Sequence, residues 1–173
     1  MAEPTHERLL EALLDSWDRN NAIMVGLLRA LPDGALELRS MEGSASIAQA
    51  FTHMHYIRLV HVFEDAPELS RDVPETEWAV EHDADRIAGM LDESAKVVRD
   101  ALKSRVGKGR EMDMHYDHPI LFLQHMLWHE AYHHGQIKLT LKLAGRPISD
   151  DVAGPISWGI WMDKTTGGTT AIH

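Results

Sequence analysis

Apolar residues recur at intervals of three and four along most of this chain, as in the run from Leu9 to Trp17. This spacing places the apolar side chains on one face of an α-helix, whereas a half-buried strand would alternate apolar and polar residues. The sequence shows no segment with that alternation. The pattern predicts four helices: from about Thr5 to Leu31, from Ser44 or Ser46 to just before Pro67, within Glu75–Lys103, and from Pro119 to Gly145.

Several of the predicted helix ends carry local signals. Ser46 is followed three residues later by Gln49, which fits a capping box in which each side chain satisfies a backbone N–H of the other residue. Pro119 suits the first turn of a helix, because no hydrogen bond is lost there. Gly145, with a proline soon after it, indicates the end of the fourth helix. The third helix is clear only from Asp83 onward.

Four amphipathic helices in 173 residues predict an all-α fold, a four-helix bundle in a single domain that spans residues 1–173. The bundle is expected over about residues 5–145. Residues 146–173 contain two prolines and four glycines, so an irregular C-terminal tail is expected there. Trp158 and Trp161 in this tail are expected to cover an end of the bundle or to line a pocket, simple packing being the plainer interpretation.

The charge balance argues against several classes of partner. The chain has 17 Lys and Arg against 27 Asp and Glu, a net charge of −10, so neither nucleic acid nor an anionic membrane surface is expected as a partner. No apolar stretch is long enough to span a bilayer. The N-terminal segment is polar and acidic and does not resemble a signal peptide. A cytoplasmic protein is therefore expected.

Histidine is the most informative residue type, because the chain has 12 histidines and no cysteine. Any metal must then be held by His, Asp or Glu. His125, His129 and His133 lie on one face of the fourth helix, but the outer two are about 12 Å apart along its axis. One ion can therefore take either His125 with His129 or His129 with His133. A polar groove of histidines without a metal is the alternative.

A third ligand is expected from the second helix, which carries His53, His55 and His61. His53 shares a largely apolar face with Ala50 and Ile57, so it should point into the bundle, toward the histidines of the fourth helix. We therefore predict His53 as the third ligand, with a hydrogen-bonded core histidine as the alternative. The histidines near chain ends or in loops are expected to be solvated surface residues: His6, His82, His115 and His173.

The stretch from His129 to His133 also fits the H-E-x-x-H pattern of zinc proteases, in which the glutamate, here Glu130, acts as general base. Such enzymes usually take a third ligand from a Glu or His downstream. After Glu130 this chain has no glutamate, and beyond His134 the only histidine is His173. No predicted strand offers an edge on which a peptide could bind. A zinc hydrolase is the least favoured interpretation.

Two segments of the chain resemble the DinB/YfiT-like family of small metal-binding four-helix proteins: Ser46–Met54 and His125–Ile137, with Leu143–Pro147 as a third, shorter match. In that family a histidine of the second helix and the two histidines of H-x-x-x-H-x-G-Q bind one divalent metal. The resemblance covers residues 5–147 and implies a site of His53, His129 and His133. Position 134 is often Arg in relatives and is His here.

The resemblance also implies a function. Family members of known activity include transferases and isomerases that depend on low-molecular-weight thiols, which favours a metal-dependent enzyme with a small-molecule substrate, a thiol among the candidates. Zinc is the expected ion and nickel the alternative, and a homodimer is a further expectation. Glu130 is the candidate catalytic residue, either as proton acceptor or only as an orienting neighbour. The rival interpretation is a non-catalytic metal-binding or stress-related protein.

Overall fold

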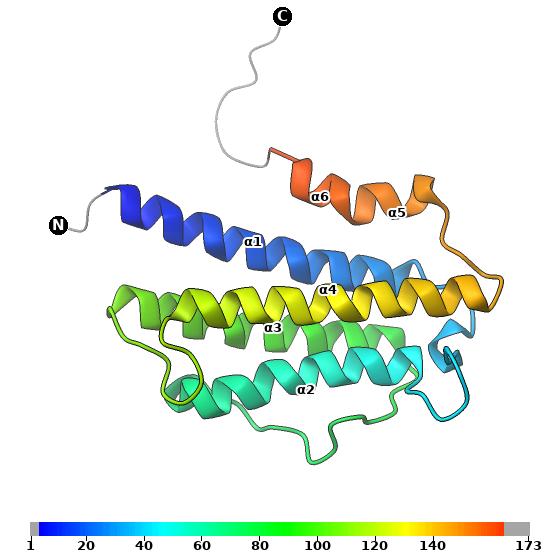
Figure 1. Ribbon diagram of the computed structural model, residues 1–173, viewed down its shortest axis with the longest axis horizontal. Helices are drawn as coiled ribbons and strands as arrows, with labels where there is room; N and C mark the ends of the chain where they lie inside the picture. The colour runs from blue at the N-terminus through cyan, green and yellow to red at the C-terminus, as the bar shows by residue number, and fades with distance from the viewer. Residues whose placement is uncertain (1–3, 165–173) are drawn as a thin grey trace, which may run out of the picture.

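Four long helices lie side by side in the computed structural model, which describes residues 4–164 (Figure 1). They are α1 (Pro4–Arg29), α2 (Ile47–Asp65), α3 (Ala84–Gly107) and α4 (Pro119–Leu143). The shorter elements are the 3₁₀ turns η1 (Ala35–Glu37) and η2 (Pro67–Leu69) and the helices α5 (Asp150–Ile156) and α6 (Trp158–Met162). Over residues 4–164 the only strand-like pairing is an isolated bridge between Arg39 and Ser46. The predicted all-α bundle is confirmed.

The local signals in the sequence fix the helix ends. The Ser46 hydroxyl accepts the backbone N–H of Gln49 at 3.2 Å, and the Gln49 side chain accepts the backbone N–H of Ser46 at 3.0 Å, so the capping box is formed at both bonds. The Asp83 carboxylate caps α3 by accepting the backbone N–H groups of Asp85 and Arg86. Gly145 follows α4 with a φ of 68°, a left-handed conformation that a glycine adopts without strain.

The C-terminal segment differs from the irregular tail that was expected. It forms α5 and α6, which run along α1 on the side away from α2 (Figure 1). The approach is close: a Cβ atom added to Gly26 of α1 would lie 3.2 Å from the Cβ of Ile156. The prolines and glycines of this segment predict irregular structure. The two helices, of seven and five residues, are too short for a helical pattern of apolar residues to reveal them in the sequence.

The direction of the helices gives the bundle one long connection. α1 and α4 run one way and α2 and α3 the other, so the chain must return along the bundle between α2 and α3 (Figure 1). Residues 66–83, here called the crossover segment, make this return. The segment is tied to the first half of α2, where Gln49 donates to the Trp78 carbonyl at 3.0 Å and Thr52 donates to the Ala79 carbonyl at 2.6 Å. Bundles with such crossovers are a known variant of the fold.

The core consists of two hydrophobic clusters separated by a polar layer. One cluster holds Met24, Phe51 and Ile137, and the other holds Trp17 and Phe122. Between them lies a buried group with members from all four long helices: Asn20, Asn21, Arg58, Ser94 and Glu130. Over residues 4–164 no helix combines the length and apolarity needed to cross a bilayer.

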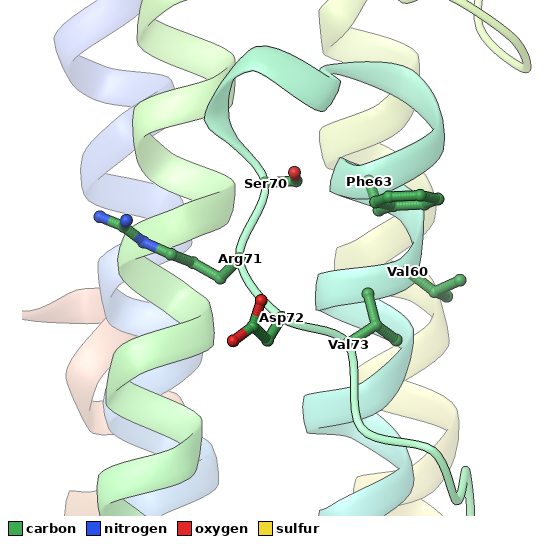
Figure 2. A pocket seen from close by; sticks show the side chains of 6 residues that line it. All are labelled: Val60, Phe63, Ser70, Arg71, Asp72 and Val73. Atoms are coloured by element: carbon green, nitrogen blue, oxygen red, sulfur yellow. The ribbon is translucent and has the colours of Figure 1, made fainter.

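Not all of the apolar series of α2 belongs to this core. Phe63 is 55% exposed, and with Val60 and Val73 it lines a groove of about 610 Å³. Figure 2 shows this groove between α2 and the part of the crossover segment around Arg71 and Asp72, whose side chains point away from α2. None of its lining residues is a histidine, and it shares no lining residue with the cleft described below. This groove therefore plays no part in the candidate site.

Candidate metal centre

Three imidazoles from two helices meet at one point. His129 Nε2 lies 3.1 Å from His53 Nε2 and 3.1 Å from His133 Nε2. Two ligands of a tetrahedral ion with metal–nitrogen bonds of about 2.1 Å lie about 3.4 Å apart, so the observed separations are close to those of a metal site. The structure thus brings together the three residues predicted as ligands, and these three form one of the groups able to hold an ion.

The surroundings of these rings favour their neutral form. Burial lowers the pKa of His53 to about 4, with a smaller contribution from His133. Burial lowers the pKa of His129 to about 3, and the neighbouring His133 and His53 add to the effect. Burial lowers the pKa of His133 as well. A neutral imidazole has a free lone pair and can bind a metal without first losing a proton, so all three rings are ready ligands at neutral pH.

The crossover segment holds His53 from its outer side. The Trp78 ring stacks on the His53 ring with centroids 3.8 Å apart and planes within 2° of parallel. A carboxylate oxygen of Glu77 lies 3.0 Å from His53 Nδ1. This is a charge contact and not a hydrogen bond, since His53 Nδ1 has no hydrogen-bond partner among the described residues. Sequence reasoning missed both residues, because no local signal indicates that the crossover segment passes over α2 at this histidine.

Glu130, predicted as a catalytic residue, lies in the polar layer of the core. Its side chain is 1% exposed, and its two oxygens accept hydrogen bonds from Arg58 Nε at 2.5 Å and Arg58 Nη2 at 2.8 Å. Asn20 donates a further bond of 2.6 Å. Arg58 also donates to Asn21 and to the Leu91 carbonyl. The role of Glu130 as proton acceptor therefore has no support in this geometry. The sequence signal that could have predicted this ion pair is Arg58, a single arginine among the apolar residues in the middle of α2.

The other histidines of α2 and α4 have separate partners. His125, the alternative ligand, hydrogen-bonds through Nδ1 to the Tyr116 hydroxyl at 2.7 Å. His55 makes a 2.7 Å bond to the Met90 carbonyl and is a core histidine. His134 lines a pocket of about 420 Å³ together with Trp158 and Trp161. The two tail tryptophans thus line a pocket, the second of the two alternatives expected for them.

The three imidazoles open onto a cleft of about 1020 Å³ between α2, α4 and the loop that precedes α2. Exposed aromatic side chains stand around the histidines, among them Trp78, Trp128 and Tyr132. Leu139 and Leu143 of α4 extend the lining, and Arg39 lies at the loop. A large, mostly apolar cleft with a few convergent polar groups is typical of small-molecule sites.

The fold and the site define a class of compact α-helical bundle with a cluster of three histidines, two buried and one half-buried, at a cleft. The family model described as the DinB family matches residues 1–158, and the chain belongs to that family. The resemblance drawn from the histidine motifs is confirmed by this match. No curated protein and no solved structure matches the chain. Family membership and the histidine cluster are both compatible with metal binding.

Proposed function

We propose that this chain binds one divalent metal ion through His53, His129 and His133 and works as a metal-dependent enzyme on a small molecule. The observation that supports the proposal best is the meeting of three Nε2 atoms, with His129 Nε2 3.1 Å from each of the other two. Without a metal, the same contacts can serve as hydrogen bonds between neutral rings, and the convergence of three ring nitrogens beside a cleft favours the metal. Imidazole ligands suit zinc and nickel, and zinc is the proposed ion.

The chemistry that such an ion supplies when bound is Lewis acidity at an open position, where it polarises a thiol or lowers the pKa of water. The residues of this chain provide the rest. Trp78, Trp128 and Tyr132 offer aromatic surfaces beside the three imidazoles, on which the organic part of a substrate can lie.

The proposed reaction is the transfer of a low-molecular-weight thiol to an electrophilic acceptor, or an isomerisation that uses such a thiol. In the transfer, the sulfur forms a bond to the electrophilic carbon, the leaving group departs with its bonding pair, and the thiol proton passes to solvent. The family supports this class of reaction, and the cleft of about 1020 Å³ is large enough for both reactants.

Glu130 is proposed as a positioning residue in this scheme. Its ion pair joins α4, which carries His129 and His133, to α2, which carries His53. Because Glu130 follows His129 directly and Arg58 lies five residues after His53, the pair fixes the two ligand-bearing segments relative to each other. A rigid supporting contact of this kind keeps a metal site in its productive geometry.

Metal analysis tests the site. Zinc content per chain should fall by about one ion, relative to the wild type, in each of His53→Ala, His129→Ala and His133→Ala. His82→Ala is the matched control, since His82 is an exposed histidine bonded to Glu37 outside the site. If His53→Ala binds zinc as tightly as the wild type, the third ligand is wrongly assigned.

A second experiment tests the reaction class. Zinc-loaded wild type and His129→Ala are incubated with small thiols and electrophilic acceptors, and thiol consumption is followed. Turnover by the wild type alone supports the thiol transferase. Metal binding without any turnover would favour the rival interpretation, a non-catalytic metal-binding or stress-related protein.

A further inference from the structure

A second group of metal-binding side chains lies beyond the three-histidine centre. His61 and Glu64 come from the last turns of α2, and His115 comes from the loop between α3 and α4. One potential ligand atom from each residue lies within 4.8 Å of the other two. His115 was expected to be a solvated surface residue, and although its side chain is 42% exposed, it is held by specific contacts.

The first of these contacts orients the His115 ring. Asp65, which is fully buried, accepts a 2.9 Å hydrogen bond from His115 Nδ1 with one carboxylate oxygen. The other oxygen accepts the backbone N–H groups of Met114 at 3.0 Å and His115 at 2.7 Å. In the neutral ring, with its proton on Nδ1, the lone pair of Nε2 is free, and the hydrogen bond to Asp65 also raises the pKa of His115, so a metal ion must displace a proton at lower pH. A buried carboxylate behind a histidine is the usual outer partner of a metal ligand.

The second set of contacts fixes the loop that carries His115. Arg105 of α3 is fully buried and donates to both oxygens of Asp113, at 2.5 and 2.9 Å. It also donates to Glu68 and to the Glu111 carbonyl. The backbone N–H of Asp113 in turn donates to the Asp65 carbonyl at 3.0 Å. The loop is therefore held against the end of α2 by a buried arginine.

The third ligand position is equally constrained. His61 lies with its ring centroid 5.7 Å from that of His115 and 5.6 Å from that of His125. The Tyr116 hydroxyl bridges the two helices, 2.7 Å from His125 Nδ1 and 3.5 Å from His61 Nδ1. Glu64 and Asp65 bring two negative charges to the cluster, which balance the charge of a divalent ion.

We propose that His61, Glu64 and His115 form a second divalent-metal site, oriented by Asp65. Two imidazoles and one carboxylate form a donor set that zinc accepts with an open fourth position. His61 lies eight residues after His53, about 12 Å along α2. This span exceeds the separation of about 4 Å in two-metal centres, so the ion is independent of the three-histidine centre. All three ligands are partly exposed, which makes the ion exchangeable with solvent.

Zinc titration of the chelator-treated protein, with equilibrium dialysis and elemental analysis, tests the proposal. The wild type should bind two zinc ions per chain. His129→Ala, which disables the first site, should still bind one. Adding His115→Ala or Glu64→Gln to that variant should weaken the remaining binding at least tenfold, whereas adding His82→Ala should leave it unchanged. Cobalt should give visible absorption bands at both sites and lose one set with each variant.

The outcomes separate the two sites. A wild type that binds a single zinc ion, lost in His129→Ala, would overturn the second site and leave the first intact. A wild type that binds a single zinc ion, lost in Glu64→Gln and kept in His129→Ala, would overturn the first site and leave the second intact. Unchanged binding in both His115→Ala and Glu64→Gln also contradicts the proposal. Both side chains are partly exposed, so the variants should fold, and circular dichroism of each variant checks this.

Discussion

At the scale of single residues, His129 and Glu130 are neighbours in sequence that belong to different environments. The His129 ring faces the cleft with two other imidazoles, while the Glu130 carboxylate turns into the core and meets Arg58. One step along an α-helix rotates the side-chain direction by about 100°, and this rotation separates the proposed ligand His129 from the structural residue Glu130. One turn of α4 thus places the histidines of the H-E-x-x-H motif at the cleft and its glutamate in the ion pair of the core.

Loss of the Glu130 charge should destabilise the bundle. Glu130→Ala leaves Arg58 buried and without its counter-charge, so the free energy of unfolding should fall by about 3 to 5 kcal/mol. Urea unfolding followed by circular dichroism measures the change. Glu93→Gln, at an exposed position of α3, is the control and should lie within about 0.5 kcal/mol of the wild type. A stable Glu130→Gln variant that has lost only turnover would instead restore Glu130 as a proton acceptor.

Metal-free protein should lose stability in a defined pH range. The pKa values of His53 and His129, about 4 and about 3, are lower than the value of about 6.5 expected in the unfolded chain. As pH falls below 6.5, the unfolded chain takes up protons at these rings before the folded chain does. The free energy of unfolding therefore decreases from pH 6.5 toward pH 4.

Urea midpoints measured across this range in the presence of chelator give the slope. His129→Gln, which cannot titrate at this position, should show a shallower slope than the wild type. Equal slopes for the two proteins would mean that the His129 ring is protonated as readily in the folded state as in the unfolded state.

At the scale of elements, the crossover segment matters more than its lack of regular structure suggests. It is pinned to α2 by the bonds of Gln49 and Thr52, and it delivers Trp78 and Glu77 to the outer side of His53. A loop that is fixed on a rigid helix in this way can complete a site whose ligands all lie on helices.

Removal of the stacked indole should weaken the site without unfolding the protein. Trp78→Ala frees the His53 ring, and loss of such a supporting contact typically lowers metal affinity by about 10-fold or more. Competition with a chromogenic zinc chelator measures the affinity. Trp128→Ala is the matched control, because it removes an indole from the same cleft that stacks on none of the three ligands. Equal affinities for the two variants would contradict the role given to Trp78.

The elements also show where sequence reasoning succeeds and where it stops. Helix ends with local signals, such as Ser46 with Gln49 or Gly145, could be predicted to within a residue or two, because the bonds that form them are local. His53 could be predicted from the apolar face it shares. The pairing of Arg58 with Glu130 depends on contacts 72 residues apart, and no local pattern encodes such a distance.

At the scale of the whole molecule, the bundle should stay folded without metal. Two hydrophobic clusters and the Arg58–Glu130 layer hold the four helices together independently of the three imidazoles. A bound ion adds stability according to its concentration and affinity, about 2.7 kcal/mol at 100 times the dissociation constant.

Thermal unfolding with and without chelator tests this view. Chelator should lower the melting temperature of the wild type by several degrees and leave its helical content at 20 °C unchanged, and His129→Ala should respond less than the wild type. Loss of helix on chelation would show that the metal is needed for folding, as in zinc fingers.

The order of the helices has a consequence for how the protein is made. His53 precedes His129 by 76 residues, and α4 is the last long helix. At about 5 to 20 residues per second on a ribosome, roughly 4 to 15 s separate the synthesis of these two residues. During that interval His53 and Arg58 of α2 lack His129 and Glu130, their partners in the folded protein. The nascent chain therefore cannot assemble the three-histidine centre until α4 has been synthesised.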